Sequence, residues 1–123
     1  MARRDVEGPI HRSILHWLRL VLPGALIHHS ANEINISGDR VMREIGKAKA
    51  LGMAKGWPDI EVLTADGPLF LEVKAPGREP SEDQSAIHAK MRRLGYRVAV
   101  VRGIEDVRAA LAEWGVKTRE ARA

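Results

Sequence analysis

The sequence of 123 residues contains no cysteine. This absence excludes disulfide bonds, thiol catalysis and zinc sites built from cysteine thiolates. No apolar run approaches the roughly 20 residues that a membrane span requires, and the start of the chain lacks the apolar segment of a signal peptide. Internal repeats and low-complexity segments are also missing. We therefore expect a single domain at residues 1–123, located in the cytoplasm, or in the host cytoplasm if the protein is viral.

The chain does carry an excess of positive charge. Its 20 Lys and Arg residues against 16 Asp and Glu residues give a formal net charge of +4. Hydrophobic residues make up 45% and charged residues 29%, which is typical of a globular protein with one core. A basic balance of this kind favours a polyanionic partner such as DNA.

Residues 56–74 carry the pattern of a β-hairpin. Two strand-like segments, Asp59–Thr64 and Leu69–Lys74, flank the tetrapeptide at 65–68, whose sequence is Ala-Asp-Gly-Pro. Asp-Gly between apolar segments is a strong signal for a tight turn. Because side chains alternate along a strand, Phe70, Glu72 and Lys74 are expected on one face.

This hairpin brings acidic side chains together. With the turn at 65–68, Lys74 is predicted opposite Asp59 and Glu72 opposite Glu61, so that Asp59 and Glu72 become diagonal neighbours. Two carboxylates at that spacing can hold one divalent cation between them. The alternative is that Glu72 and Lys74 form a solvent-exposed pair on an edge strand, with Asp59 as an ordinary turn acid.

The same residues resemble a nuclease signature. Pro58-Asp59 followed by Glu72-Val73-Lys74 resembles the PD-(D/E)XK motif. The longer segment Gly56-Trp57-Pro58-Asp59 resembles the G-x-P-D motif of the VRR-NUC family, the virus-type replication-repair nucleases, and especially its small stand-alone phage and bacterial members. Gln84, which follows Ser81 by three residues, resembles the glutamine that opens a helix in that family.

The resemblance extends upstream of the hairpin. Residues 7–15 resemble the N-terminal helix of the family, which begins with a metal-site glutamate, and Asn32-Glu33 also resembles small phage members. In all, the similarity runs from about Glu7 to Trp114. From the residues alone, Glu7 is equally explained as an acid at a helix start, where the helix dipole favours it, and Gln84 as part of a Ser-x-x-Gln capping box.

The resemblance implies an α/β fold with a PD-(D/E)XK, restriction-endonuclease-like core and a metal-dependent endonuclease activity on DNA. It implies structure-specific cleavage of branched, flapped or junction DNA in replication, repair or recombination. The implied metal is Mg²⁺ or Mn²⁺, held by Glu7, Asp59, Glu72 and the backbone carbonyl of Val73. The implied catalytic residues are Asp59, Glu72, Lys74 and Gln84.

The remaining chain predicts a central mixed sheet with helices on its faces. Hydrophobic periodicity and capping residues indicate a first helix that begins at Glu7 or Gly8 and ends at Pro23-Gly24, further helices at 39–51, 81–94 and 104–114, and strands at 25–29, 59–64, 69–74 and 96–101. The third helix is expected to bury Ile87, Met91 and Leu94, and the last strand is expected in the sheet interior. The core is predicted at about 7–115, followed by a mobile basic tail at 116–123.

Positive side chains offer candidate DNA contacts. The helix at 39–51 has a basic face that could follow phosphates, although an ordinary solvated face explains it as well. The candidate nucleic-acid-binding residues are His11, Arg40, Arg43, Lys47, Lys55 and His88.

Two other functions fit parts of the sequence. One is a non-catalytic DNA-binding or regulatory subunit with the same fold. The other is a sequence-specific restriction-type endonuclease, although 123 residues leave little room for a base-reading element. A single-site enzyme that cuts both strands of a junction needs two chains, so a homodimer is expected.

Overall fold

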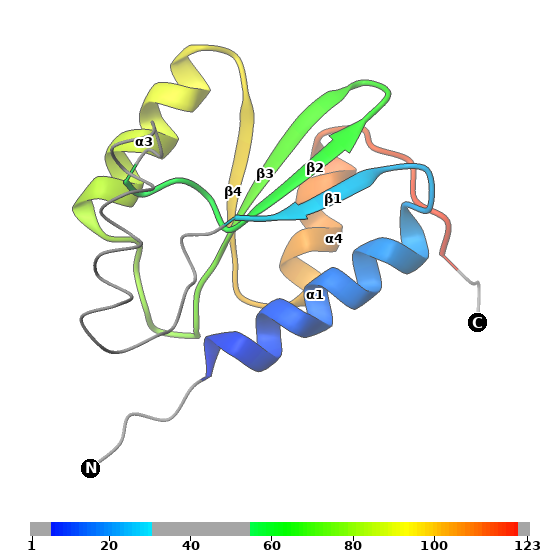
Figure 1. Cartoon of the computed structure of the whole chain (residues 1–123), viewed down its shortest axis with the longest axis horizontal. Coiled ribbons are helices and arrows are strands. Elements are labelled where there is room, and N and C mark those ends of the chain that lie inside the picture. Colours follow the sequence, from blue (N-terminus) through cyan, green and yellow to red (C-terminus); the bar gives the residue numbers. More distant parts are fainter. Residues whose placement is uncertain (1–5, 31–54, 121–123) are drawn as a thin grey trace, which may run out of the picture.

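A computed structural model describes residues 6–30 and 55–120 of the chain. The predicted helix at 39–51, its candidates Arg40, Arg43 and Lys47, and the segment Asn32-Glu33 lie outside the described residues. The elements in order are α1 (Glu7–Val21), β1 (Leu26–His29), β2 (Ile60–Thr64), β3 (Gly67–Val73), α3 (Glu82–Arg93), β4 (Arg97–Val101) and α4 (Ile104–Glu113) (Figure 1).

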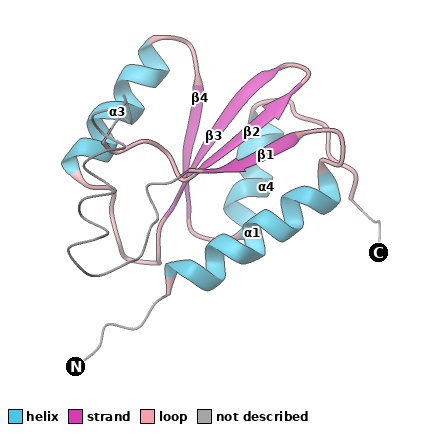
Figure 2. Ribbon diagram, in the orientation of Figure 1, coloured by secondary structure: helices cyan, strands magenta, loops and turns pink. Residues whose placement is uncertain are grey.

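The strands form one mixed sheet in the order β1-β2-β3-β4. The β1–β2 and β2–β3 pairs are antiparallel, whereas β3 and β4 are parallel and are joined through α3. Helices α1 and α4 pack on one face of the sheet and α3 packs on the other (Figure 2). The predicted α/β class with a mixed central sheet is therefore confirmed.

The core divides between the two faces. The larger cluster joins α1 and α4 to the sheet, and it includes Ile14, Leu18, Leu69, Leu71 and Leu111 among its buried members. Full burial of such a side chain stabilises the fold by about 1.5–3 kcal/mol. A smaller cluster of Phe70, Met91 and Val98 lies under α3. Residues of β3 alternate between the two faces, as predicted, and the structure shows that odd-numbered residues face α1 and α4 whereas even-numbered residues face α3.

The register of the hairpin differs from the prediction by two residues. Thr64 pairs with Gly67 and Ile60 with Leu71, so that only residues 65 and 66 form the turn and Pro68 lies within β3. The chain therefore turns earlier than predicted, for a local reason. The Thr64 hydroxyl donates to the Gly67 carbonyl across 2.9 Å, and Gly67 adopts φ +114°, a conformation that glycine reaches without a steric cost. A shift of two residues leaves every side chain on its predicted face.

Two further predictions about packing are wrong. Leu94 is 67% exposed because α3 ends at Arg93, and the chain turns away at Gly95, where φ is +93°. Strand β4 was expected in the interior, but it lies at an end of the sheet that the described residues form. It still packs on both faces, with Val98 in the cluster under α3 and Val101 in the larger one.

The segment after α4 returns to the body of the protein. The backbone N–H of Arg119 donates to the carbonyl of Val21 across 2.7 Å, and Arg108 donates to the carboxylate of Glu120 across 3.0 Å. Residues 116–120, where the sequence predicts a mobile tail, therefore make defined contacts with the end of α1 and with α4.

Within residues 6–30 and 55–120, no helix combines the length and the apolar character that crossing a bilayer demands.

Candidate active site

Two buried acids meet at one end of the β2–β3 hairpin. Asp59 directly precedes β2 and is 4% exposed, and Glu72 lies near the end of β3 and is 1% exposed. The β2–β3 register, continued by one position beyond the Ile60–Leu71 pair, places Asp59 opposite Glu72. The acids are therefore directly opposed and not diagonal as predicted. Burying two carboxylates side by side is costly unless each has polar partners.

Asp59 is held in place by backbone groups on both sides. Its carboxylate oxygen Oδ2 accepts a hydrogen bond from the N–H of Val73 across 2.8 Å. Its own carbonyl accepts from the N–H of Ser30, also at 2.8 Å, which ties the end of β1 to the same point. These contacts fix the Asp59 carboxylate beside the strand ends, where β1 and β3 end and β2 begins.

The glycine of the Gly-Trp-Pro-Asp motif lies against the first turn of α3. Gly56 has φ +87°, and a Cβ at this position would come within 2.7 Å of the backbone of Asp83. Glycine is therefore required here both for its backbone conformation and for the close approach. The neighbouring Lys55 forms an ion pair with Asp83 across 3.0 Å, and both side chains are exposed. This approach brings the start of α3 next to the Gly56 end of the Gly-Trp-Pro-Asp segment.

Gln84 acts in the helix cap and also contacts the site. The Ser81 hydroxyl accepts from the N–H of Gln84, and the Gln84 side-chain oxygen accepts from the N–H of Ser81 at 2.8 Å, which completes a capping box. The amide nitrogen Nε2 of Gln84 then donates to Oε2 of Glu72 across 3.3 Å. The capping role that the sequence predicts is confirmed, and the same side chain reaches an acid of the predicted site.

His88 lies one helical turn after Gln84 and contacts the same carboxylate. Its Nε2 is 3.3 Å from Oε1 of Glu72, and the side chain is 2% exposed. Burial lowers the pKa of His88, and the nearby positive charge of Arg92 lowers this pKa further. The imidazole is thus favoured in its neutral form. Such burial removes His88 from the surface, so the predicted direct contact with DNA does not fit this position.

Lys74 lies beside Glu7 at the border of the site. Its Nζ is 4.0 Å from Oε1 of Glu7, and the two side chains are 16% and 38% exposed. The backbone N–H of Lys74 donates to the carbonyl of Val101 across 3.0 Å, which extends the β3–β4 pairing to this residue. Glu7, the first residue of α1, is therefore linked to the site by its ion pair with Lys74.

The three predicted metal-site acids do not gather around one point. In the part of the chain that the structure describes, no group of three or more His, Cys, Asp or Glu side chains is placed to hold a metal ion. The structure brings Asp59 and Glu72 together and leaves Glu7 next to Lys74.

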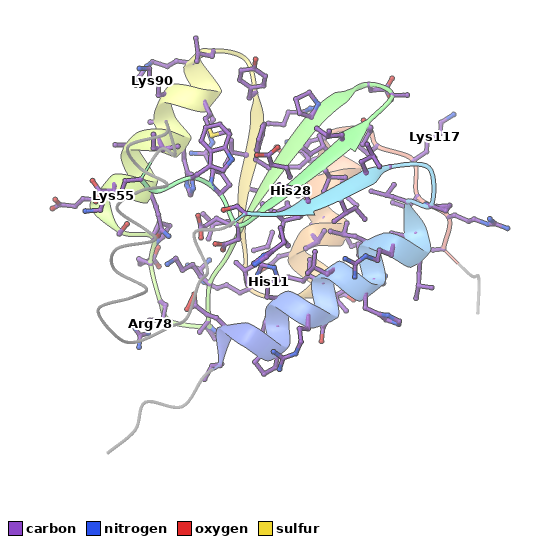
Figure 3. All side chains as sticks on the ribbon, viewed as in Figure 1. His11, His28, Lys55, Arg78, Lys90 and Lys117 are labelled. Carbon is purple, nitrogen blue, oxygen red and sulfur yellow. The ribbon has the colours of Figure 1, made fainter. Side chains whose placement is uncertain are left out.

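A histidine pair that sequence reasoning missed lies next to the site. Nε2 of His11 is 3.0 Å from Nδ1 of His29, and the rings meet edge to face with their centroids 4.7 Å apart. His11 lies between α1 and the sheet and is only 4% exposed, so the predicted DNA contact does not fit it (Figure 3). The sequence does show that His11 lies one helical turn after Glu7, which suggests a position near the site. Nothing in the sequence indicates that His11 contacts β1.

The residues at the hairpin end suit a hard divalent cation. Asp59 and Glu72 supply carboxylate oxygens, and the carbonyl of Val73 follows directly in the chain. Mg²⁺ prefers oxygen ligands, and it typically takes one or two carboxylates and retains several waters. This donor set fits Mg²⁺ or Mn²⁺ on chemical grounds.

Comparisons with known proteins identify the fold. No family model matches the sequence, and no curated protein matches it. A solved structure described as a VRR_NUC domain protein aligns over 92% of this chain and 90% of its own, with 19% identity and a TM-score of 0.66. A second, described as a VRR_NUC domain, aligns over 87% and 94%, with 24% identity and a TM-score of 0.58. The chain therefore has the fold of solved VRR_NUC domains, as its resemblance to that family predicts.

Proposed function

We propose that this protein is a VRR-NUC family endonuclease that hydrolyses phosphodiester bonds in DNA with the help of a divalent metal ion. The observation that supports this proposal best is the placement of Asp59 and Glu72. Both acids are buried at one hairpin end, at 4% and 1% exposure, with Lys74 two residues beyond Glu72. A fold shared with VRR_NUC domains provides independent support.

Asp59, Glu72 and the carbonyl of Val73 would hold Mg²⁺ or Mn²⁺, and Glu7 would complete the site directly or through a water molecule. When bound, such an ion polarises a phosphoryl oxygen and lowers the pKa of a coordinated water. The protein contributes rigid positions for the ligands, since the Asp59 carboxylate is bonded to the backbone of Val73.

Lys74 and Gln84 would act on the reacting phosphate. The ammonium group of Lys74, two residues beyond Glu72 in the chain, would orient the attacking water and stabilise charge that develops on the phosphoryl oxygens. Glu7 restrains this ammonium group from 4.0 Å away. The amide of Gln84 has two N–H hydrogens, so one can remain bonded to Glu72 while the other faces a water or the scissile phosphate.

We infer that the substrate is branched or flapped DNA and that the active form is a homodimer. The net charge of +4 supports a polyanionic substrate. The proposed site has one pair of acids, Asp59 and Glu72, in each chain, and cleavage of both strands of a junction then needs two chains. Light scattering at micromolar concentration tests the dimer, and a monomer there contradicts it.

A non-catalytic DNA-binding protein is the alternative that one observation favours. Both carboxylate oxygens of Glu72 already contact side chains of α3, namely Gln84 and His88. Such contacts could satisfy the buried acid without any metal. This alternative predicts DNA binding that ignores Mg²⁺ and is unaffected by changes at Asp59.

The deciding experiment incubates labelled duplex, flap and four-way-junction DNA with the protein in Mg²⁺, Mn²⁺ or EDTA. The proposal expects cleavage with either metal and none in EDTA. Asp59→Asn and Lys74→Ala should bind DNA without cutting it, whereas Asp66→Asn, an exposed acid in the hairpin turn, is the matched control and should cut normally. Cleavage that survives in Asp59→Asn or Lys74→Ala contradicts the proposed site.

A further inference from the structure

The carboxylate of Glu72 is contacted at both of its oxygens by one helix. Gln84 Nε2 lies 3.3 Å from Oε2, and His88 Nε2 lies 3.3 Å from Oε1. Residues 84 and 88 are four apart on α3, and such residues share one face of a helix. The two contacts together fix the plane of the carboxylate as well as its position.

We propose that His88 is a positioning residue, which holds the Glu72 carboxylate in the orientation that binds the divalent cation. This inference rests on the proposed function, because it assumes that Asp59 and Glu72 are metal ligands. It gives His88 a role that differs from the surface DNA contact expected from the sequence.

The direction of the hydrogen bond follows from the chemistry of the two groups. An ionised carboxylate can only accept, so Nε2 of His88 must carry the hydrogen that it donates to Glu72. Each carboxylate oxygen offers two lone-pair sites, and one donor leaves the second site of that oxygen for a cation. Carboxylates that bind metals are commonly held by such outer hydrogen bonds.

Burial makes the His88 contact hard to replace. Glu72 is 1% exposed and His88 is 2% exposed, which leaves little access for bulk water to take over the role of the imidazole. His88 belongs to α3, which packs on the same side of the sheet as the apolar cluster of Phe70, Met91 and Val98. An aliphatic residue could fill the same space, so packing alone does not require a histidine.

The contact of Gln84 with Glu72 is oriented by the N-terminal cap of α3. Because Oε1 of Gln84 accepts from the N–H of Ser81, the amide nitrogen of Gln84 must point the other way, toward Glu72. His88 has no share in the capping box and supplies the donor for the opposite oxygen. Removal of His88 should therefore free one side of the carboxylate while α3 still begins at its cap.

The test compares Mn²⁺ binding to DNA-free protein, measured by titration calorimetry and by the electron paramagnetic resonance signal of free Mn²⁺. In His88→Leu, which fills the space without a donor, we expect the dissociation constant for Mn²⁺ to rise about 10–100-fold. His88→Gln keeps an N–H donor at a similar reach and should recover most of the affinity. His16→Leu changes an exposed histidine of α1 and should bind as the wild type does.

The outcomes separate the inference from the function on which it rests. If Asp59→Asn loses Mn²⁺ while His88→Leu binds it normally, the positioning role is wrong and the metal site stands. Failure of the wild type to bind Mn²⁺ removes the proposed function and this inference with it. A kinetic readout agrees with the positioning role if His88→Leu raises the Mg²⁺ concentration for half-maximal rate and leaves KM for DNA unchanged.

A measurement on the wild-type protein keeps the inference testable even if His88→Leu does not fold. Two-bond ¹⁵N–¹H correlation spectra distinguish the two neutral tautomers of an imidazole, and His88→Gln assigns the resonance. The inference expects the hydrogen of His88 on Nε2. A hydrogen on Nδ1 with a bare Nε2 overturns the proposed hydrogen bond.

Discussion

The backbone N–H of Val73 donates a hydrogen bond to the carboxylate of Asp59 across 2.8 Å, so the acid before β2 is fixed by the last residue of β3. Val73 is itself fully buried, with 0% exposure. This single contact ties the position of one proposed metal ligand to the strand that carries the other.

That bond predicts different stabilities for two substitutions at Asp59. Asn retains an oxygen acceptor for the Val73 N–H, whereas Ala leaves a buried donor without a partner, at a cost of about 1–3 kcal/mol. We expect Asp59→Ala to unfold at a lower urea concentration than Asp59→Asn, although both variants should be inactive. Equal unfolding midpoints would show that the bond contributes nothing to stability.

A side chain at Gly56 should destabilise the protein by a steric clash. Comparison with Gly77 separates this clash from backbone strain. Gly56 and Gly77 have φ of +87° and +80°, so alanine strains the backbone similarly at both, by about 1–2 kcal/mol. Only at Gly56 would a Cβ meet backbone atoms, at 2.7 Å from Asp83, whereas nothing lies within 4 Å at Gly77. Gly56→Ala should therefore lose about 1–3 kcal/mol more stability than Gly77→Ala.

The same comparison has a functional readout. Displacement of the first turn of α3 should move Gln84 away from Glu72, so Gly56→Ala should also lose nuclease activity under conditions where it remains folded. Gly77→Ala should retain that activity. Similar losses of stability and activity in both variants contradict the close approach at Gly56.

Glu7 is predicted to matter for the metal and little for the fold. Its partly exposed ion pair with Lys74, at 4.0 Å, should contribute less than about 1 kcal/mol to stability. Glu7→Gln should therefore leave the thermal midpoint nearly unchanged and raise the Mg²⁺ concentration for half-maximal cleavage. Glu113→Gln, an exposed acid of α4, is the control. If the two variants show the same Mg²⁺ dependence, Glu7 is only a helix-terminal acid.

His88 predicts how stability depends on pH in metal-free solution. Burial and the charge of Arg92 lower its pKa, Asp59 raises it, and Lys74 lowers it. The unfolded chain therefore takes up a proton near the ordinary histidine value of about 6.5, above the pKa in the folded protein. The contribution of His88 to stability is full above about pH 6.5 and is lost as the pH falls toward the folded-state pKa.

This pH dependence can be isolated by substitution. In EDTA, urea unfolding from about pH 5 to 8 should show a decline for the wild type below about pH 6.5. His88→Gln keeps the donor to Glu72 but does not titrate, so its decline should be shallower. Identical declines in both proteins contradict a lowered pKa for His88.

Much of the fold and part of the site could be predicted because they depend on local patterns. The Asp66-Gly67 turn signal, strand alternation and the Ser81 capping box predict the hairpin, the faces of β3 and the start of α3 correctly. The register was wrong because the position of a turn depends on bonds such as that from Thr64 to Gly67, which composition does not specify.

Contacts between distant segments could not be predicted from local patterns. His88 was predicted as a DNA contact, but α3 packs against the sheet with His88 facing Glu72, 16 residues earlier in the chain. The His11–His29 contact likewise joins residues 18 apart on α1 and β1. Both contacts follow from how the helices dock on the sheet, which a single sequence does not reveal.

Asp59 and Glu72, buried at one end of the hairpin, are proposed to hold a divalent cation between them. Crystals soaked in Mn²⁺ and measured at a wavelength near the manganese absorption edge test this claim most directly. We expect an anomalous peak at about 2.0–2.6 Å from a carboxylate oxygen of each acid. No peak at this hairpin end, with Glu72 still bonded to Gln84 and His88, would contradict it.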